Sequence, residues 1–408
     1  MSSHERASAG IRHSVVKALR FEGPLSRGDL ARRVGITRGQ LSRYVDELTR
    51  VGLVREVGFA ASTGGRKARL LELNADAGYI VAVDLGATSL DVAITDLHVR
   101  VLAHESRPVE VGEGPAVVLD LVTRMTREML DRLGIPARKV LALGMGVPGP
   151  VDYQLGRTVS PPIMPGWNQF PIKEHLSEVI GCPAYVDNDV NIMALGEQFA
   201  GLGRHAVNFI YVKLGTGIGA GIVVGGRLYR GTDGCAGDIG HIAVDGADVV
   251  CRCGNTGCLE ALAGGPGIAR RAKEAASQGR APLVAEFLAS HPGRDLTAVD
   301  VGQLAAKGDP GAIEVVRETG RLIGRVLASI VNMFNPSLIV LGGGVAQIGD
   351  LLLASIREAV YRRSLPLATR HLRIERSVTD PRSGILGAAV LALDEVLSAE
   401  ALERGLNR

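Results

Sequence analysis

The sequence predicts an α/β protein whose two-lobed body follows a small head made of helices and one hairpin. Three observations support this: amphipathic segments with capping residues before residue 73, two glycine loops that each follow a buried strand, and a length of 408 residues, which calls for two or three domains. The chain is 46% hydrophobic, which is enough for a large core. Its 53 glycines fall in short runs between apolar stretches, without any low-complexity tract, as expected for ligand loops.

Charge is distributed unevenly along the chain. Residues 1–73 hold 14 Lys and Arg against 7 Asp and Glu, a net charge of +7, whereas the remainder has a net charge of −4. A basic head on a slightly acidic body indicates that only the head meets a polyanion. Charge alone does not distinguish a polyanion-binding surface from a basic surface that faces solvent and binds no partner.

Targeting signals and cysteines bear on the compartment. The N-terminus MSSHERASAG has no apolar signal core, and no run is long enough to span a bilayer. We therefore expect a soluble cytoplasmic protein with no membrane partner. Of the five cysteines, three lie within residues 251–258. An odd count without a secretion signal favours a metal site or free thiols over disulfides.

The first 50 residues predict three short helices in a helix-turn-helix arrangement. Ser26 is a suitable N-cap for the second helix, and Gly35 supplies a tight turn after it. Thr37 and Gln40 form a capping-box pattern that opens the third helix. The first turns of such a helix carry the side chains that read bases and contact phosphates. The residues expected to contact DNA there are Thr37, Arg38, Gln40, Ser42 and Arg43.

Two strand-like runs follow, at residues 53–57 and 69–73, and the loop between them is basic at its tip. This hairpin resembles the wing of a winged helix, in which Arg66 and Lys67 contact phosphates or enter a minor groove. The alternative is a three-helix module for protein interaction. Winged helices act in pairs on two-fold operators, so we expect a homodimer or homotetramer that binds operator DNA.

The body opens with a strand at residues 79–85 that runs into a small-residue turn, and residues 209–219 echo this pattern. Two such hairpins, with a cleft between them, are how the actin-like and sugar-kinase fold (ribonuclease H-like) cradles phosphates on backbone amides. A Rossmann fold is disfavoured because no G-x-G-x-x-G follows the first strand. The predicted nucleotide-binding residues are Asp84, Gly86, Thr88, Gly215, Thr216, Gly217, Gly219 and Gly343.

A polar cluster lies between the two hairpins, where a strand end feeds a helix at residues 192–200. Asn188 can hydrogen-bond sugar hydroxyls in both directions, and Asp189 can act as general base for phosphoryl transfer to a sugar. Upstream, the loop that contains Asn168 is suited to line the same cleft. The alternative for Asp187 or Asn188 is simple helix capping.

Four metal-ligating side chains crowd into a glycine-rich loop, namely His241, Cys251, Cys253 and Cys258. Three sulfurs and one imidazole suit tetrahedral zinc, and four protein ligands close its shell, which indicates a structural site. The alternative is a group of buried free thiols. The second ring nitrogen of His241 can bond a sugar hydroxyl, and Glu260 projects from the same segment.

These motifs together resemble the ROK family (repressors, unknown reading frames and sugar kinases), in particular its regulator branch with a winged-helix head. The matching segments are residues 84–88, 146–150, 188–191, 214–219, 237–241, 251–260 and 335–344. The resemblance implies that the sugar contacts are Asn188, Asp238, His241 and Glu260. It also places Asp189 at the catalytic base of the kinases, and the His and three Cys above at the zinc ligands.

The resemblance also implies the domain limits. The head spans residues 1–73, the first lobe spans 78–190 with a C-terminal helix at 383–397, and the second lobe spans 191–382 with the zinc loop and oligomer contacts.

The chain departs from the family at several site positions. In the first phosphate loop, Ala87 and Ser89 stand where kinases have Gly and Lys, and elsewhere Asp238 stands where Glu is usual. These departures weaken the case for efficient use of ATP.

The sequence therefore predicts a DNA-binding transcription regulator, a repressor of carbohydrate-utilisation genes, that binds a sugar or sugar phosphate next to a structural zinc ion. The alternative is an ATP-dependent sugar kinase that keeps a DNA-binding head, with Asp189 as base and ATP and Mg²⁺ as cofactors. A zinc-dependent nucleic-acid module is disfavoured because the metal motif lies far along the chain from the basic head.

Overall fold

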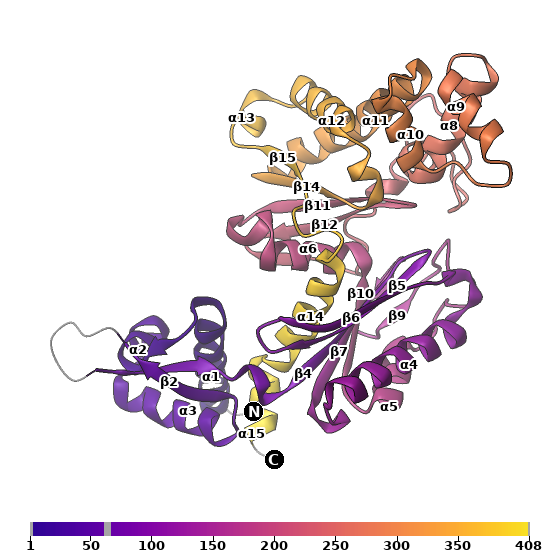
Figure 1. The fold of residues 1–408 in the computed structure, drawn as a ribbon. Coiled ribbons are helices and arrows are strands. Elements are labelled where there is room, and N and C mark those ends of the chain that lie inside the picture. Colours follow the sequence, from indigo (N-terminus) through magenta and orange to yellow (C-terminus); the bar gives the residue numbers. More distant parts are fainter. Residues whose placement is uncertain (1–2, 61–66, 407–408) are drawn as a thin grey trace.

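The computed structural model describes residues 3–60 and 67–406. It has a two-lobed α/β body and a separate N-terminal head that lies beside the end of the first lobe (Figure 1). Each lobe is built on one five-stranded sheet. The predicted fold class is confirmed.

The head is a winged helix whose elements form where the capping residues predict them. Ser26 accepts a hydrogen bond from the amide of Asp29 and starts the second helix, which ends at Gly35 in the left-handed conformation. Thr37 and Gln40 form the predicted capping box at the third helix. The elements are α1 (Ser3–Glu22), β1 (Leu25–Ser26), α2 (Arg27–Val34), α3 (Arg38–Arg50), β2 (Val54–Phe59) and β3 (Arg69–Leu73).

The first lobe carries a sheet in the order β10-β7-β4-β5-β6, in which β4 pairs antiparallel with β5 and parallel with β7. Helices α4 and α5 cover one face (Figure 1). The elements are η1 (Ala75–Ala77), β4 (Tyr79–Leu85), β5 (Ser89–Asp96), β6 (Val101–Pro108), η2 (Val111–Glu113), α4 (Pro115–Leu133), η3 (Ala137–Lys139), β7 (Val140–Val147), β8 (Val151–Asp152), β9 (Arg157–Thr158), α5 (Ile172–Ile180) and β10 (Ala184–Asn188), where η denotes a 3-10 helix. Helix α6 (Asp189–Ala200) follows β10 and leads into the second lobe.

The second lobe repeats this topology with the order β13-β12-β11-β14-β15. Its elements are η4 (Leu202–His205), β11 (Phe209–Leu214), β12 (Ile218–Val224), β13 (Arg227–Tyr229), η5 (Ile239–His241), α7 (Leu259–Ala263), α8 (Gly265–Ser277), α9 (Pro282–Ser290), α10 (Ala298–Ala306), α11 (Pro310–Phe334), β14 (Leu338–Gly342), η6 (Gly344–Gln347), α12 (Asp350–Arg363), α13 (Pro366–Thr369) and β15 (Arg373–Arg376).

The two sheets share one topology, which agrees with the echo between residues 79–85 and 209–219 in the sequence. In both, an antiparallel hairpin (β4–β5 or β11–β12) is extended by one antiparallel strand on one side and two parallel strands on the other. The turns fall between Leu85 and Leu90 in the first hairpin and between Leu214 and Ile218 in the second. The two glycine loops therefore occupy equivalent places in the two lobes.

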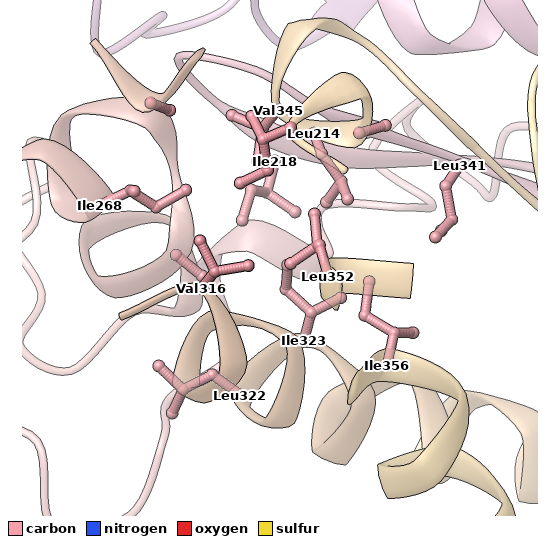
Figure 2. Packing of buried hydrophobic residues seen from close by; sticks show 14 of the residues in the cluster. Leu214, Ile218, Ile268, Val316, Leu322, Ile323, Leu341, Val345, Leu352 and Ile356 are labelled. Atoms are coloured by element: carbon pink, nitrogen blue, oxygen red, sulfur yellow. The ribbon is translucent and has the colours of Figure 1, made fainter. Parts of the chain in front are cut away.

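The core of the second lobe lies between its sheet and helices α8, α11 and α12. Figure 2 shows Leu214 and Leu341 from the sheet opposite Ile323 of α11 and Ile356 of α12. All four side chains are buried. At roughly 1.5–3 kcal/mol for each fully buried aliphatic side chain, this packing makes a large contribution to the stability of the lobe.

Two helices lie between the sheets. Helix α6 packs on β11 and β12 of the second sheet, while α14 (Ser383–Val396) packs on β4 and β7 of the first, and the two helices pack against each other (Figure 1). Glycines make this contact close: a Cβ on Gly387 would lie 1.6 Å from the carbonyl oxygen of Ile192. The sequence predicted α14 at 383–397, and α15 (Ala399–Leu406) follows it onto the head.

In the described ranges, 3–60 and 67–406, no helix combines the length and the apolarity that crossing a membrane requires.

Candidate functional site

A cleft of about 240 Å³ lies between the two lobes. Both glycine loops, the start of α6 and the segment before the metal cluster contribute to its wall. Among the predicted site residues, the structure brings together around this cleft Gly86, Thr88, Asn188, Asp189, Thr216, Gly217, Gly219, Asp238, His241 and Glu260.

Asn188 is both a helix cap and a cleft residue. Its Oδ1 accepts a hydrogen bond from the amide of Val190 at 3.0 Å, which caps α6. Its Nδ2 donates to the carbonyl oxygen of Gly149 at 2.9 Å. An Asn side chain can make up to four hydrogen bonds, so each end keeps capacity for a ligand. The capping alternative therefore holds, and it is compatible with ligand binding.

Asp189, the predicted base, is buried at the first turn of α6 and forms an ion pair with Lys213 of β11. Lys213 is not among the site residues predicted from the sequence. Burial disfavours the charged ammonium, but Asp189 and Asp84 outweigh this effect and hold the pKa of Lys213 above its usual value. The carboxylate of Asp189 thus faces the positive charge of Lys213.

Asp84, at the end of β4, lies behind the cleft wall and is only 9% exposed. Burial raises the pKa of Asp84 to about 7, although the Lys213 ammonium opposes the shift. A Cβ on Gly384 would lie 1.7 Å from Asp84 Oδ2, so the first turn of α14 touches this carboxyl group directly.

Glu260 links the metal segment to the second glycine loop. It lies in the first turn of α7, and its Oε2 accepts a hydrogen bond from the amide of Ile218 at 3.1 Å. Gly217 permits this approach, since a Cβ there would lie 2.8 Å from the same oxygen. Within residues 3–60 and 67–406, the other carboxylate oxygen, Oε1, has no hydrogen-bond partner, and Glu260 lines the cleft.

The four predicted metal ligands come together in one cluster. One ligand atom from each of His241, Cys251, Cys253 and Cys258 lies within 4.8 Å of the others. The Cys253 and Cys258 sulfurs are 3.7 Å apart, and Cys251 Sγ is 3.8 Å from His241 Nδ1. Zn–S bonds of about 2.3 Å in tetrahedral geometry place two sulfurs about 3.8 Å apart, so the donor set fits zinc.

The geometry of His241 connects the metal cluster to the cleft. Because Nδ1 faces Cys251, Nε2 is left for another partner, and the residue lines the cleft. Asp238 precedes it by one turn of 3-10 helix, and burial raises the pKa of the Asp238 carboxyl group. Gly237 lets this segment approach β12, because a Cβ there would lie 1.8 Å from the carbonyl oxygen of Ala220.

The remaining predicted cleft residues have other surroundings. Asn168 is exposed, lies outside the cleft wall, and accepts a hydrogen bond from the amide of Ser160 at 2.8 Å. Gly343 donates its amide to Asp380 Oδ2 at 2.7 Å, and Gly215 donates to the carbonyl of Gly217 at 3.0 Å. Neither glycine lines the cleft. Their roles in ligand binding stay predictions.

Sequence reasoning also missed Arg230, which joins three elements. Its Nε donates to Asp187 Oδ2 at 2.8 Å, and its guanidinium lies 4.0 Å from the ring centre of Tyr153. The Tyr153 hydroxyl donates in turn to Glu395 of α14 at 2.7 Å. Asp187 is therefore an anchor for Arg230 rather than a helix cap. A lone basic residue beside a hairpin carried no signal of this partnership.

The expected DNA contacts lie at the start of α3. Arg38, Gln40 and Arg43 are exposed, and Ser42 is half-buried. Thr37 and Gln40 also bond each other in the capping box, so both serve the helix end itself. Lys67 is exposed beside β3, whereas Arg66 lies outside the described residues.

The head is attached to the end of the body by a buried arginine. Arg12 of α1 donates to Glu47 of α3 at 2.9 and 2.8 Å and also forms an ion pair with Glu403 of α15. Nearby, His13 Nδ1 lies 2.8 Å from the carbonyl oxygen of Leu397, and Arg20 pairs with Asp394 of α14. One cluster of buried apolar side chains runs from the head through α15 and α14 to β4.

Comparison with known proteins agrees with this architecture of a DNA-binding head on a sugar-kinase-like body. A winged helix-turn-helix DNA-binding model matches residues 11–55, and the ROK family model matches residues 80–395. The chain belongs to the ROK family.

Similar proteins include both regulators and kinases. The xylose repressor of Caldicellulosiruptor bescii is 29% identical over 94% of this chain and 95% of its own length. The crystal structure of a ROK family transcriptional regulator, described as a homologue of the E. coli MLC protein, superposes with a TM-score of 0.85 at 26% identity over 98% of this chain and 99% of its own. A ROK family glucokinase from Streptomyces griseus, crystallised with glucose and AMPPNP, gives a TM-score of 0.67 at 30% identity over 77% of this chain and 99% of its own.

Proposed function

We infer that this protein is a sugar-responsive transcriptional repressor that binds operator DNA through its winged-helix head. This proposal is supported above all by a continuous series of contacts that leads from the cleft through α14 and α15 to the head. Helix α14 begins against Asp84 behind the cleft, and α15 continues it onto Arg12, which holds Glu47 of α3. A ligand that binds one arrangement of the lobes better than another can therefore shift the arrangement of the head.

The effector is a sugar or sugar phosphate held beside a structural zinc ion. The amide and carboxylate groups of Asn188, Asp238 and Glu260 converge on the cleft, as recognition of hydroxyl groups requires. Zinc bound by one imidazole and three thiolates would fix the loop that carries His241 and leave Nε2 for a sugar hydroxyl. The likeness to a xylose repressor supports a carbohydrate effector.

DNA binding requires two heads on a two-fold operator, so we propose a homodimer or homotetramer. Arg38, Gln40, Ser42 and Arg43 would enter the major groove, and Lys67 would contact the backbone beside it. Sedimentation velocity of the purified chain, with and without operator, measures the number of chains in the complex.

The decisive experiment combines ligand binding with DNA binding. An operator is first selected from a random duplex library by the purified protein, and its affinity is measured by fluorescence anisotropy. A thermal-shift screen with pentoses, hexoses, amino sugars and their phosphates identifies ligands of the folded state. We expect a sugar that raises the melting temperature to change operator affinity as well. Sugars that bind without any effect on operator affinity would refute the sensing role.

A matched pair of variants locates the sugar. Asp238→Asn removes a charge in the cleft, whereas Asp245→Asn makes the same change at an exposed position outside the cleft wall. Only the first should weaken sugar binding, by roughly 1.5–3 kcal/mol if the carboxylate accepts a hydrogen bond from the sugar. Equal affinities for both variants would place the sugar elsewhere.

A sugar kinase remains the second candidate, because Thr88, Asp189 and Thr216 share one cleft and a ROK glucokinase superposes on the body. A coupled assay of ADP formation, with the sugars that bind, tests this reaction. Turnover that disappears in Asp189→Asn would establish phosphoryl transfer, with Asp189 taking the proton of the attacking hydroxyl.

A further inference from the structure

The ion pair between Lys213 and Asp189 lies where the two lobes meet. Lys213 is the single charged residue in the otherwise apolar strand β11, and its side chain is only 19% exposed. Its partner Asp189 is 8% exposed by its side chain and lies at the start of α6. Both residues line the cleft. Burial of a charged lysine lowers the stability of the fold unless the ammonium is paired. The ion pair with Asp189 therefore allows a positive charge at this position.

Three carboxyl groups stabilise the charge of this ammonium, and one of them, Asp189, is in direct contact with it. Asp84 lies on the first lobe and Asp189 on α6, and both stabilise the charge on Lys213, as does Asp380 before α14. Asp380 is itself held in place, since its carboxylate accepts hydrogen bonds from Tyr211 at 2.9 Å and from the amide of Gly343 at 2.7 Å. Negative charge from both lobes thus acts on one cation, which is in direct contact with Asp189.

Such a group of carboxylates beside two phosphate-type loops is where a magnesium ion would be expected. Mg²⁺ requires oxygen ligands in a near-octahedral arrangement and keeps several of its waters. Here an ammonium already pairs with Asp189, and its charge would repel a divalent cation brought to the same carboxylates. The residues of this chain therefore do not fit a bound Mg²⁺ ion.

We propose that the ammonium of Lys213 takes the place of the divalent cation in this cleft, so that the protein binds its effector without Mg²⁺ or ATP. The biological meaning of this inference rests on the sugar-sensing function proposed above. The ammonium joins β11 of the second lobe to Asp189 of α6 by a direct ion pair, and the charge of Asp84 on the first lobe stabilises it further. The cleft is then a receptor site for the sugar alone.

Metal binding tests this inference without sugar or DNA, so its failure is distinct from failure of the sensing function. Mn²⁺ serves as the probe for Mg²⁺, and free Mn²⁺ is measured by electron paramagnetic resonance in titrations of the zinc-loaded full chain. We expect Lys213→Thr to bind Mn²⁺ roughly tenfold more tightly than the wild type or better, which corresponds to about 1.4 kcal/mol of repulsion removed. Lys213→Arg keeps the charge and should show no gain.

Two further variants identify the site. Lys307→Thr removes an exposed lysine far along the chain and should leave Mn²⁺ binding unchanged. Adding Asp84→Asn to Lys213→Thr should abolish the gain. The proposal is overturned if the wild type binds Mn²⁺ as tightly as Lys213→Thr, or if that variant folds and gains nothing.

A second measurement needs no variant and covers the case in which Lys213→Thr fails to fold. The sugar-induced rise in melting temperature of the wild type should be the same with and without Mg²⁺ and ATP. A rise that depends on Mg²⁺ would overturn the proposal.

Discussion

The ion pairs of Arg12 make a quantitative prediction about how the body acts on the head. Arg12 and Glu403 are 8% and 18% exposed by their side chains, and they join α1 to α15 across almost the whole length of the chain. A hydrogen bond between charged groups contributes about 1.5–3 kcal/mol, and partial solvent exposure reduces this to about 1–2 kcal/mol here. Glu403→Gln should therefore change the free-energy difference between the positions that the head can take relative to the body by about 1–2 kcal/mol, which is about 5–30-fold in their equilibrium constant.

The assay is operator affinity by fluorescence anisotropy, measured with and without a saturating sugar. Glu400→Gln is the matched control, because it makes the same charge change at an exposed position on α15. We expect Glu403→Gln to change operator affinity, its response to sugar, or both, within the range above. We expect Glu400→Gln to behave as the wild type, since α15 has no predicted DNA contact.

A double-mutant cycle with Arg12→Met separates the ion pair from the individual residues. We expect Glu403→Gln to have little further effect on operator affinity once Arg12 is replaced. If Glu403→Gln and Glu400→Gln give the same operator affinity and the same sugar response as the wild type, the path through α15 does not carry the signal. Coupling would then pass through the other contacts between head and body, namely Arg20 with Asp394 and His13 with Leu397, or through the linker between β3 and β4.

Three other perturbations follow from the site. Cys253→Ser should lose bound zinc, as measured by mass spectrometry, and should have a lower melting temperature than the wild type. Cys235→Ser, which lies outside the cluster, should keep its zinc and its melting temperature. Zinc loss without a fall in melting temperature would contradict a structural role. Because burial raises the pKa of Asp84 to about 7, the folded state holds a proton that the unfolded state releases near pH 4, so this group costs stability as pH rises from about 4 to 7. Asp84→Asn should therefore raise the melting temperature at pH 8 but not at pH 4, and an equal effect at both would refute the assignment. Gly384→Ala should destabilise by about 1–3 kcal/mol because its Cβ would lie 1.7 Å from Asp84, whereas Gly10→Ala, with no atom within 4 Å, should not.

The features that sequence reasoning predicted well are those set by nearby residues. The capping box of Thr37 and Gln40 spans four residues, and Ser26 caps α2 through the amide of Asp29. The metal ligands lie within residues 241–258 and converge in the structure. In each case the partners are close in the chain, so their spacing alone constrains where the side chains can meet.

The features that it missed depend on distant partners. Lys213 pairs with a residue 24 positions away, Arg230 with one 43 positions away, and Arg12 with one 391 positions away. None of these pairs has a periodicity or a motif, because the fold and not the local chain brings the two residues together. Asn168 shows that local composition can also mislead. Its loop has a composition suited to a cleft, but its side-chain oxygen accepts a hydrogen bond from the amide of Ser160 in the same loop.

Glycines of the body bring helix α14 into close contact with both lobes, and α14 continues through α15 to the head. A Cβ on Gly144 of β7 would lie 2.0 Å from the carbonyl oxygen of Ala388, and one on Gly196 of α6 would lie 2.0 Å from that of Ser383. Helix α14 is thus in backbone contact with both the first sheet and α6. Packed interiors deform little, so we expect a shift of α6 toward a ligand to be passed on at this contact. In the proposed sensing mechanism it would move α14, and with it α15 and the salt-bridged end of the head.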